Sequence, residues 1–322
     1  MGKILITGAC GQLGSELTEK LRSIYGKEEV VATDIQDPPE SISDGPFEYL
    51  DVMKKDAIAK VIDEHDIKEV YHLAALLSAK AEQNIELGWK LNMDGLLHVL
   101  NLAKEKSLDK IFWPSSIAVF GPDAPSKDTG QNVALNPTTV YGISKMAGEQ
   151  WCSYFHENFG VDVRSLRYPG LIGYKSLPGG GTTDYAVDIH YKALKNEPFS
   201  CFLDKDNALP MMYMEDAIDA TIQLMQADES DIEIRTSYNL SAISFTPEEI
   251  AEAIKKHMPG FEISYDPDYR KKIADSWPDS IDDSPAREQW GWNHEYDLNK
   301  MVGDMLANIP KANPEMLKAK EA

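Results

Sequence analysis

The chain has 322 residues, of which 43% are hydrophobic and 26% charged, and its formal net charge is −21 at pH 7. The length and composition suit one large folded α/β unit with a smaller appendage. The excess of acid argues against nucleic acid or an anionic membrane as a partner, because phosphate groups would be repelled. Three scattered cysteines exclude a disulfide framework, and the sequence has no HExxH or CxxC motif that would bind a metal. No apolar run nears the roughly 18 residues of a membrane span. We therefore expect a metal-free cytoplasmic protein.

In the first half of the chain, short apolar runs alternate with longer amphipathic stretches, a pattern typical of βαβ units on a parallel sheet. The first strand begins so close to the N-terminus that we expect no signal peptide. The predicted fold class is α/β, a doubly wound parallel sheet (Rossmann) with a smaller C-terminal substrate or lid domain, because the strands are apolar almost throughout. Strands are predicted at Lys3–Thr7, Glu29–Asp34, Glu69–Ala74, Lys110–Ser115 and Asp162–Arg167, and helices at Gln12–Tyr25, Lys54–Asp63, Ile85–Glu105 and Tyr141–Phe159.

Beyond Tyr168 the pattern changes. A glycine-rich loop, LPGGGTT at 177–183, precedes a predicted helix over Asp184–Lys195, and a short strand is predicted at Ser237–Leu240. Thr246-Pro247-Glu248-Glu249 opens a further helix with a capping box, and the proline- and tryptophan-rich tail predicts a small irregular lid. We expect a dinucleotide-binding domain over residues 1–175, with 213–242 returning to it, and a small substrate domain over 176–212 and 243–322.

The loop after the first strand holds three glycines, Gly8, Gly11 and Gly14, within the sequence GACGQLG. The first allows a tight turn, the second lets the backbone approach a pyrophosphate, and the third lets helix and strand pack closely. The N–H groups and positive dipole of the following helix attract phosphates. The spacing GxxGxxG is a weak signal by itself, but its place between strand and helix predicts a dinucleotide site that includes Gln12 and Leu13.

Asp34 ends the second strand, where a carboxylate can accept hydrogen bonds from the adenosine ribose and repel a 2′-phosphate, so NAD is favoured over NADP. The alternative is a turn aspartate. His72 is expected to be a structural histidine rather than a proton carrier, and Asn92 either holds water or backbone near the site or is solvated. Further cofactor contacts are expected near later strand ends and on one helix, at Ile35, Asp51, Val52, Leu73, Ala74, Ala75, Asn92 and Pro114.

Tyr141 and Lys145, in the sequence YGISK, are one helical turn apart and therefore share a face. A free tyrosine has a pKa near 10, too high for a base at neutral pH, and a neighbouring ammonium favours the phenolate. Ser115 and Ser116 follow the fourth strand, at the edge where open α/β sheets bind ligands, or are simply turn serines. Each motif alone is weak, but all of them occur in the expected elements and in the expected order, which predicts an alcohol-oxidising site.

The segments GxxGxxG, HLAA, SSIAVFG, YGISK and RYPG together resemble the extended short-chain dehydrogenase/reductase superfamily, in the branch that contains nucleotide-sugar epimerases. The likeness spans most of the first 175 residues. It implies that Ser116 is the catalytic serine and Ser115 its cofactor-side neighbour. It also implies that Tyr141 is the base, that Lys145 binds the nicotinamide ribose and lowers the tyrosine pKa, and that Tyr168-Pro169 lies beside the nicotinamide.

The second half is similar, at 166–194 and 274–292, to the short-chain-type L-threonine 3-dehydrogenase family, which extends the likeness to nearly the whole chain. The resemblance implies metal-independent, NAD-dependent oxidation of L-threonine to 2-amino-3-ketobutyrate, on the route of threonine catabolism to glycine and acetyl-CoA or to aminoacetone. It also implies a homodimer formed through the helices at 94–105 and 141–159, whose apolar stripes could equally pack on the chain's own sheet.

Substrate contacts are expected from three places. Leu76 would form an apolar wall against the substrate methyl, and Trp277 would close over the substrate, or else is core packing. The substrate carboxylate would meet N–H and hydroxyl groups of the glycine-rich loop, unless that loop is only a connector, through Gly179, Gly180, Thr182 and Thr183.

Two other functions stay open at this point. An NDP-sugar epimerase or dehydratase of the same superfamily would share the tyrosine, the lysine and the glycine loop, but would keep its NAD and release no reduced cofactor. A non-catalytic NAD-sensing protein would bind the dinucleotide without needing the serine, tyrosine and lysine.

Overall fold

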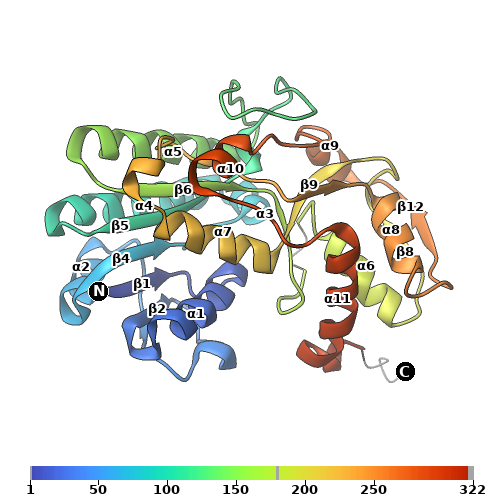
Figure 1. Ribbon diagram of the computed structural model, residues 1–322, viewed down its shortest axis with the longest axis horizontal. Helices are drawn as coiled ribbons and strands as arrows, with labels where there is room; N and C mark the ends of the chain where they lie inside the picture. Colours follow the sequence, from blue (N-terminus) through green and yellow to red (C-terminus); the bar gives the residue numbers. More distant parts are fainter. Residues whose placement is uncertain (1, 179–180, 318–322) are drawn as a thin grey trace.

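A seven-stranded parallel sheet with the order β10-β6-β5-β4-β1-β2-β3 forms the centre of the computed structural model, which describes residues 2–178 and 181–317. Helices α1 and α7 pack on one face of the sheet, and α2, α4 and α5 pack on the other (Figure 1). The doubly wound sheet predicted from the sequence is confirmed. The strands are β1 (Lys3–Thr7), β2 (Val30–Asp34), β3 (Phe47–Tyr49), β4 (Ile67–His72), β5 (Lys110–Ser116), β6 (Val163–Tyr168) and β10 (Tyr238–Asn239), and the helices are α1 (Gln12–Tyr25), α2 (Lys55–His65), α4 (Ile85–Lys106), α5 (Val140–Phe159) and α7 (Met214–Gln226).

Burial on both faces explains the apolar strands. In β1, Ile4 and Ile6 belong to the core under α1 and α7, whereas Leu5 belongs to the core under α2, α4 and α5. β1 pairs with β4 on one side and with β2 on the other, so the strand order reverses beside it. Ligands of such sheets bind at the carboxyl ends of the strands next to this reversal.

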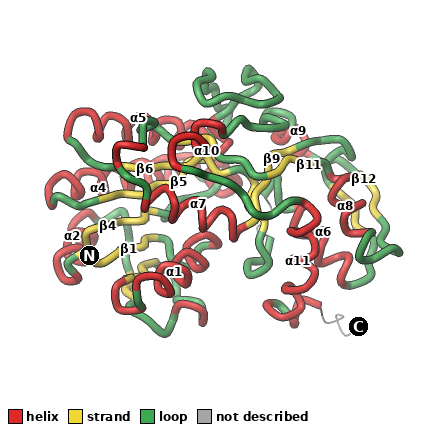
Figure 2. The backbone as a smooth tube through the Cα atoms, in the orientation of Figure 1, coloured by secondary structure: helices red, strands yellow, loops and turns green. Residues whose placement is uncertain are grey.

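A smaller set of elements with its own core lies at one end of the large sheet (Figure 2). It contains a three-stranded sheet, β11-β9-β7, and a two-stranded sheet, β12-β8. Its strands are β7 (Gly170–Ile172), β8 (Phe199–Cys201), β9 (Leu209–Tyr213), β11 (Ile243–Phe245) and β12 (Ile263–Tyr265); the remaining helices of the chain are α3 (Ser78–Gln83), α6 (Tyr185–Leu194), α8 (Pro247–Lys255), α9 (Tyr269–Ala274), α10 (Ser284–Trp290) and α11 (Leu298–Ala312).

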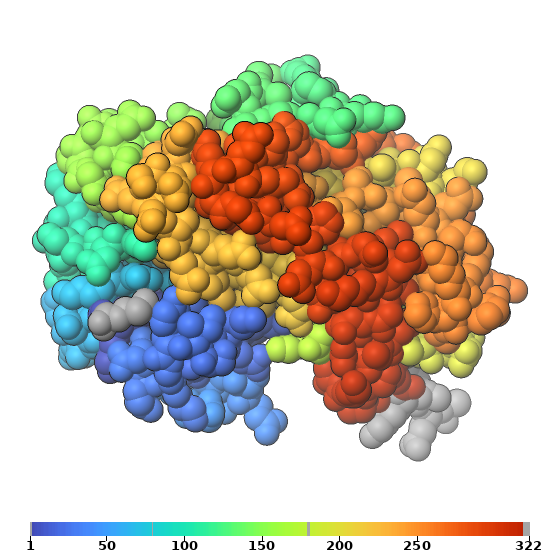
Figure 3. All heavy atoms as spheres, in the orientation of Figure 1, coloured from blue at the N-terminus to red at the C-terminus, as the bar shows by residue number. Residues whose placement is uncertain are grey.

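The tail is more regular than the sequence indicated. It contains α11, whose Met301, Val302 and Met305 are fully buried in the small core. The segment around α10 crosses to the other half of the molecule, as the orange-red atoms of Figure 3 show, and Trp292 packs into the core under α1 and α7. The capping box predicted at Thr246 is present, with Glu249 as its second member.

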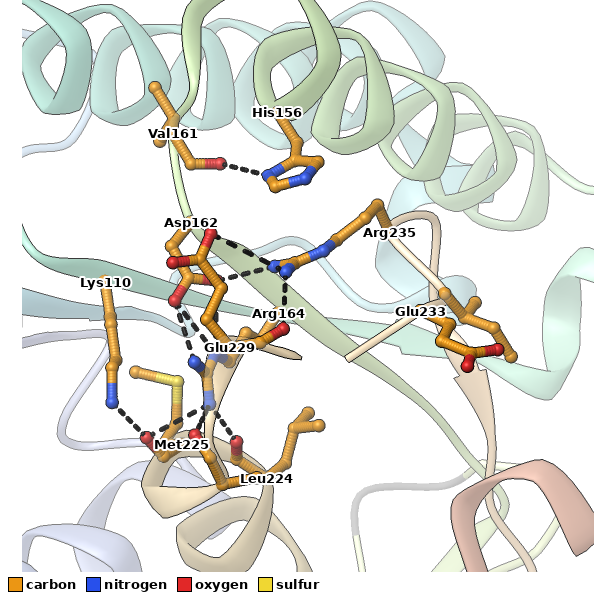
Figure 4. Close-up of polar contacts among 12 residues, drawn as sticks. Lys110, His156, Val161, Asp162, Arg164, Leu224, Met225, Glu229, Glu233 and Arg235 are labelled. Atoms are coloured by element: carbon orange, nitrogen blue, oxygen red, sulfur yellow. Dashed lines mark hydrogen bonds and ion pairs between the residues drawn. The ribbon is translucent and has the colours of Figure 1, made fainter. Parts of the chain in front are cut away.

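The buried side chain of Arg164, near the start of β6, joins the end of α7 to the sheet by hydrogen bonds (Figure 4). Arg164 on β6 is 1% exposed and donates hydrogen bonds to the carbonyl oxygens of Leu224 (2.6 Å) and Ala227 (2.7 Å), where α7 ends. Asp162 accepts from Arg164 at 2.8 Å and from Arg235 at 2.7 Å. The cation therefore satisfies carbonyl groups that the end of a helix leaves without partners.

We predict that Asp162→Asn lowers the free energy of unfolding by about 2 kcal/mol at pH 7, because it removes a charge that binds the buried guanidinium of Arg164 and the partly buried one of Arg235. Burial raises the pKa of Asp162, but its bonds with Arg164 and Arg235 outweigh burial and hold the pKa below its ordinary value. The carboxylate therefore stabilises the fold above about pH 4, and this contribution is lost at lower pH. Urea unfolding should show a constant difference from the wild type above that pH and a narrowing difference below it.

Asp228→Asn is the matched control, because Asp228 is exposed near the same helix end. It should change the unfolding free energy by less than about 0.5 kcal/mol. Equal losses in the two variants would contradict the role assigned to Asp162.

Candidate active site

The glycine loop between β1 and α1 lies at the carboxyl edge of the large sheet, beside the reversal of strand order. Gly8 has a φ of +74°, and a Cβ atom there would come within 2.6 Å of the backbone N of Ala74, just after β4. A Cβ atom on Gly14 would come within 2.2 Å of the carbonyl oxygen of Gly8, whereas on exposed Gly11 the nearest atom is 3.3 Å away. Gly8 is therefore packed against the chain that follows β4, Gly14 is packed against Gly8 and Ala9 of the loop itself, and Gly11 is exposed.

The beginning of α1 fits a diphosphate. Within this fully described helix, the N-terminus has no side-chain cap and no acidic residue in its first turn. Gln12 is exposed and Leu13 half-buried at this end. The first N–H groups of a helix lack intrahelical partners and carry the positive end of the helix dipole, so the open loop and these groups can hold the pyrophosphate of NAD.

Asp34 joins the end of β2 to the glycine loop. Its Oδ2 accepts a hydrogen bond from the backbone N–H of Cys10 at 3.0 Å, and its Oδ1 accepts from those of Ile35 (2.7 Å) and Gln36 (3.1 Å). A carboxylate can accept about four hydrogen bonds, so one more donor can still be bound. The negative charge at this position disfavours an added phosphate, which fits NAD rather than NADP.

The other residues expected at the cofactor come from one edge of the sheet. The side chain of Val52 belongs to the core under α2 and α4, and the hydroxyl of Tyr168 is hydrogen-bonded to Thr221 on α7. These two side chains therefore interact with the interior of the protein. Their main-chain atoms remain for the expected cofactor contacts. The expected residues lie within the last residues of β5 and β6 or shortly after β3, β4 and β6, at Asp51, Val52, Leu73, Ala74, Ala75, Pro114, Tyr168 and Pro169.

Asn92 holds protein backbone, one of the alternatives that the sequence left open. It is 3% exposed; its Oδ1 accepts from the N–H of Leu76 at 2.7 Å, and its Nδ2 donates to the carbonyl of Leu76 and to the hydroxyl of Ser144, both at 3.1 Å. These three hydrogen bonds are made within the protein, and the contact with the cofactor expected for Asn92 stays a prediction. His72 hydrogen-bonds Thr7 at 2.8 Å, and burial lowers its pKa to about 3, so it stays neutral as a structural histidine does.

Tyr141 and Lys145 lie in the first two turns of α5, whose N-cap Thr139 accepts a hydrogen bond from the N–H of Gly142 at 3.0 Å. The Nζ of Lys145 donates to the carbonyl oxygen of Pro114 at 2.5 Å and lies 5.5 Å from the centre of the Tyr141 ring. Lys145 is 2% exposed. The structure therefore brings the tyrosine and the lysine together at the end of β5, beside Ser116.

The electrostatics of this pair are dominated by burial. Burial raises the pKa of Tyr141 to about 12, and its hydrogen bond with Ser116 opposes the rise. Burial lowers the pKa of Lys145 to about 7, although Cys152 and Glu149 oppose the fall. A phenolate at Tyr141 therefore needs positive charge brought close to it.

The side chain of Ser115, which the resemblance makes the cofactor-side neighbour of Ser116, lies against α5. It is 2% exposed, and its hydroxyl donates to Glu149 at 2.6 Å, on the face of the sheet that α5 covers. Successive side chains of a strand point to opposite faces of the sheet, so the two adjacent serines have different partners. Glu149 also accepts two hydrogen bonds from Arg167, at 2.8 and 2.7 Å.

The sequence analysis missed the pair formed by Glu149 and Arg167. Its signal was a charged residue one helical turn beyond Lys145 and another inside the buried strand β6, since charges in such places are normally paired. The pair is fully buried and fixes α5 to β6.

The expected substrate residues lie on different elements. Trp277 packs between the small core and a cluster that includes Ile117 and Ile281, so it lies near the turn that follows Ser116. Thr182 is buried, and the side chain of Thr183 packs close to Gly170 on β7. Gly179 and Gly180 lie outside the described residues, and the N–H of Gly181 donates to Asp184 at 2.8 Å.

In residues 2–178 and 181–317, no helix is long and apolar enough to cross a membrane. Within the same residues, no three His, Cys, Asp or Glu side chains gather where they could hold a metal ion.

The chain matches the NAD dependent epimerase/dehydratase family over residues 4–241. It is 50% identical to an uncharacterized epimerase/dehydratase of Staphylococcus haemolyticus over 312 residues, covering 96% of this chain and 98% of that protein. It is similar to the solved holo form of a GalE-like L-threonine dehydrogenase from Cupriavidus necator, with 54% identity, a TM-score of 0.93 and coverage of 95% and 99%. It is also similar to the apo form of a monomeric L-threonine 3-dehydrogenase of metagenomic origin, with 45% identity, a TM-score of 0.91 and coverage of 96% and 99%.

We predict that Gly14→Ala lowers the free energy of unfolding by about 1 to 3 kcal/mol, because its Cβ atom would overlap the carbonyl oxygen of Gly8, a backbone atom that cannot rotate away. Gly11→Ala is the matched control and should cost less than about 0.5 kcal/mol, since Gly11 is exposed. Urea unfolding without ligand measures both. A larger loss for Gly11→Ala would show that the loop packs differently.

Proposed function

Since the chain belongs to the NAD-dependent epimerase/dehydratase family, we propose that it is an NAD-dependent L-threonine 3-dehydrogenase, which oxidises the side-chain hydroxyl of L-threonine to 2-amino-3-ketobutyrate. The observation that carries this proposal is the 54% identity to a threonine dehydrogenase, which runs through the small core as well as the large sheet. The placement of Tyr141 beside Lys145 at the end of β5 supports it.

The proposed chemistry removes a proton from the hydroxyl and a hydride from the β-carbon of threonine. NAD, when bound, supplies the hydride acceptor. Tyr141 accepts the proton at its phenolic oxygen, while the hydroxyl of Ser116 orients the substrate oxygen. Because burial raises the pKa of Tyr141 to about 12, the ammonium of Lys145 has to favour the phenolate while the reaction proceeds.

The rest of the proposed site comes from both halves of the molecule. Trp277 would exclude water above Ser116, Leu76 would contact the methyl group of threonine, and the loop before α6, including Thr182 and Thr183, would receive the carboxylate. The product is a β-keto acid, which loses carbon dioxide to give aminoacetone or is cleaved onward to glycine and acetyl-CoA. Both routes would place the protein in threonine catabolism.

The proposal is tested by mixing the purified protein with NAD and L-threonine and recording the absorbance of NADH. Turnover with L-threonine that exceeds turnover with L-allo-threonine, L-serine and a UDP-sugar is the expected result. Epimerisation of the UDP-sugar without release of NADH would instead support a sugar epimerase, and NAD binding without any turnover would support a non-catalytic sensor.

We predict that Tyr141→Phe lowers kcat by at least about a hundredfold while the Kd for NAD changes less than about threefold, because the phenolic oxygen acts in proton transfer. The control is Tyr269→Phe in the small half, where the side chain is 73% exposed. Stopped-flow NADH formation and NAD titration give the two quantities. Turnover near the wild-type level in Tyr141→Phe would remove Tyr141 from the base role.

We also propose that two copies pair through the outer face of α4 and α5. This face exposes large apolar side chains that a monomer rarely gathers, including Trp89, Trp151 and Tyr154. Trp151→Glu should then convert a dimer into a monomer in sedimentation velocity, whereas Tyr269→Glu, a change at an exposed tyrosine of the small half, should not. A monomeric wild-type protein would contradict this pairing.

A further inference from the structure

The side chain of Asn92 holds the start of the chain segment that follows β4. Asn92 binds both backbone groups of Leu76: its Oδ1 accepts from the N–H at 2.7 Å and its Nδ2 donates to the carbonyl at 3.1 Å. The side-chain amide thus replaces the two contacts that a neighbouring strand would make. Leu77, the next residue, is 64% exposed, so the chain here has little packing of its own.

The same amide reaches the helix that carries Tyr141. Its Nδ2 also donates to the Oγ of Ser144 at 3.1 Å, and Ser144 in turn donates to the backbone carbonyl of Tyr141 at 2.7 Å. Asn92 is 3% exposed and Ser144 is not exposed at all. Two buried side chains therefore form a continuous bridge from the backbone of Leu76 to the backbone of Tyr141.

A second contact joins the same two segments. The carboxylate of Glu82, on α3, accepts a hydrogen bond at 2.6 Å from the N–H of Val140, the first residue of α5. A negative charge at this position stabilises the beginning of a helix. The segment from Leu76 to Glu82 is thus attached to the first turn of α5 at both of its ends.

We infer that Asn92 and Ser144 are positioning residues, which hold Leu76 at a set distance from Tyr141 and thereby decide which side chain of a β-hydroxy amino acid fits between them. This inference rests on the proposed function, in which Leu76 meets the methyl group of the substrate. A pocket that contacts one additional methyl group discriminates by about tenfold or more, provided that its wall does not move. Neither residue needs to touch the substrate for this effect.

The inference is tested with Ser144→Ala, Asn92→Ala and the double variant. We expect the ratio of kcat/KM for L-threonine over L-serine to fall about tenfold in each single variant, while the Kd for NAD stays within twofold of the wild type. The double variant should lose no more than either single variant, because both changes break one bridge. Peptides covering 73–84 should exchange amide hydrogen faster in all three.

Two matched controls remove hydroxyl and amide groups from the same helices. Ser153 on α5 donates to Glu157, and Asn101 on α4 donates to the carbonyl of Leu97. Ser153→Ala and Asn101→Ala should leave the substrate ratio and the exchange of 73–84 unchanged. Melting temperatures show whether each variant is folded.

Three results would overturn the inference: an unchanged threonine-to-serine ratio, losses that multiply in the double variant, or unaltered exchange of 73–84. The exchange measurement uses no substrate. A wild-type protein that oxidises neither amino acid would therefore refute the proposed function alone. The amide exchange of residues 73–84 would still decide whether Asn92 and Ser144 hold Leu76 in place.

Discussion

The hydrogen bond from the buried side chain of Lys145 to the backbone of β5 is the interaction on which the rest of the site depends. The ammonium donates to the carbonyl of Pro114 inside β5, so a charge on α5 is held against the strand that ends in Ser116. Removing a charge from water is costly unless hydrogen bonds compensate, so the helix cannot slide along the sheet without losing this bond. The relative positions of tyrosine, lysine and serine follow from that attachment.

A second buried charge reinforces the first. Glu149, one turn beyond Lys145, accepts from Ser115 and from Arg167, so α5 is tied to both β5 and β6. Arg167 also donates to Asn239 on β10, which binds the carbonyl of Asp282. Polar contacts thus continue from the helix with Tyr141 to the segment that follows Trp277. Through them, the segment that follows Trp277 is positioned relative to the helix that carries Tyr141.

How far the sequence predicts this protein depends on the range of each signal. The helix from Gln12 to Tyr25 and the capping box at Thr246 were predicted correctly, because a cap, a glycine and an apolar period lie within a few residues of each other. The helices α7 and α11 were missed, although both bury apolar residues. The first directly follows a buried apolar strand and the second contains Pro310, so a local pattern does not separate them from their surroundings.

For the site, the sequence by itself determined the glycine loop, the aspartate that ends β2 and the spacing of Tyr141 and Lys145, since each depends on neighbours along the chain. Only the tertiary structure decided that Ser115 faces Glu149 and that Asn92 joins Leu76 to Ser144. Those partners are separated by 34, 16 and 52 residues. A buried hydroxyl or amide takes whichever partner the fold brings within reach, and that choice has no local signature.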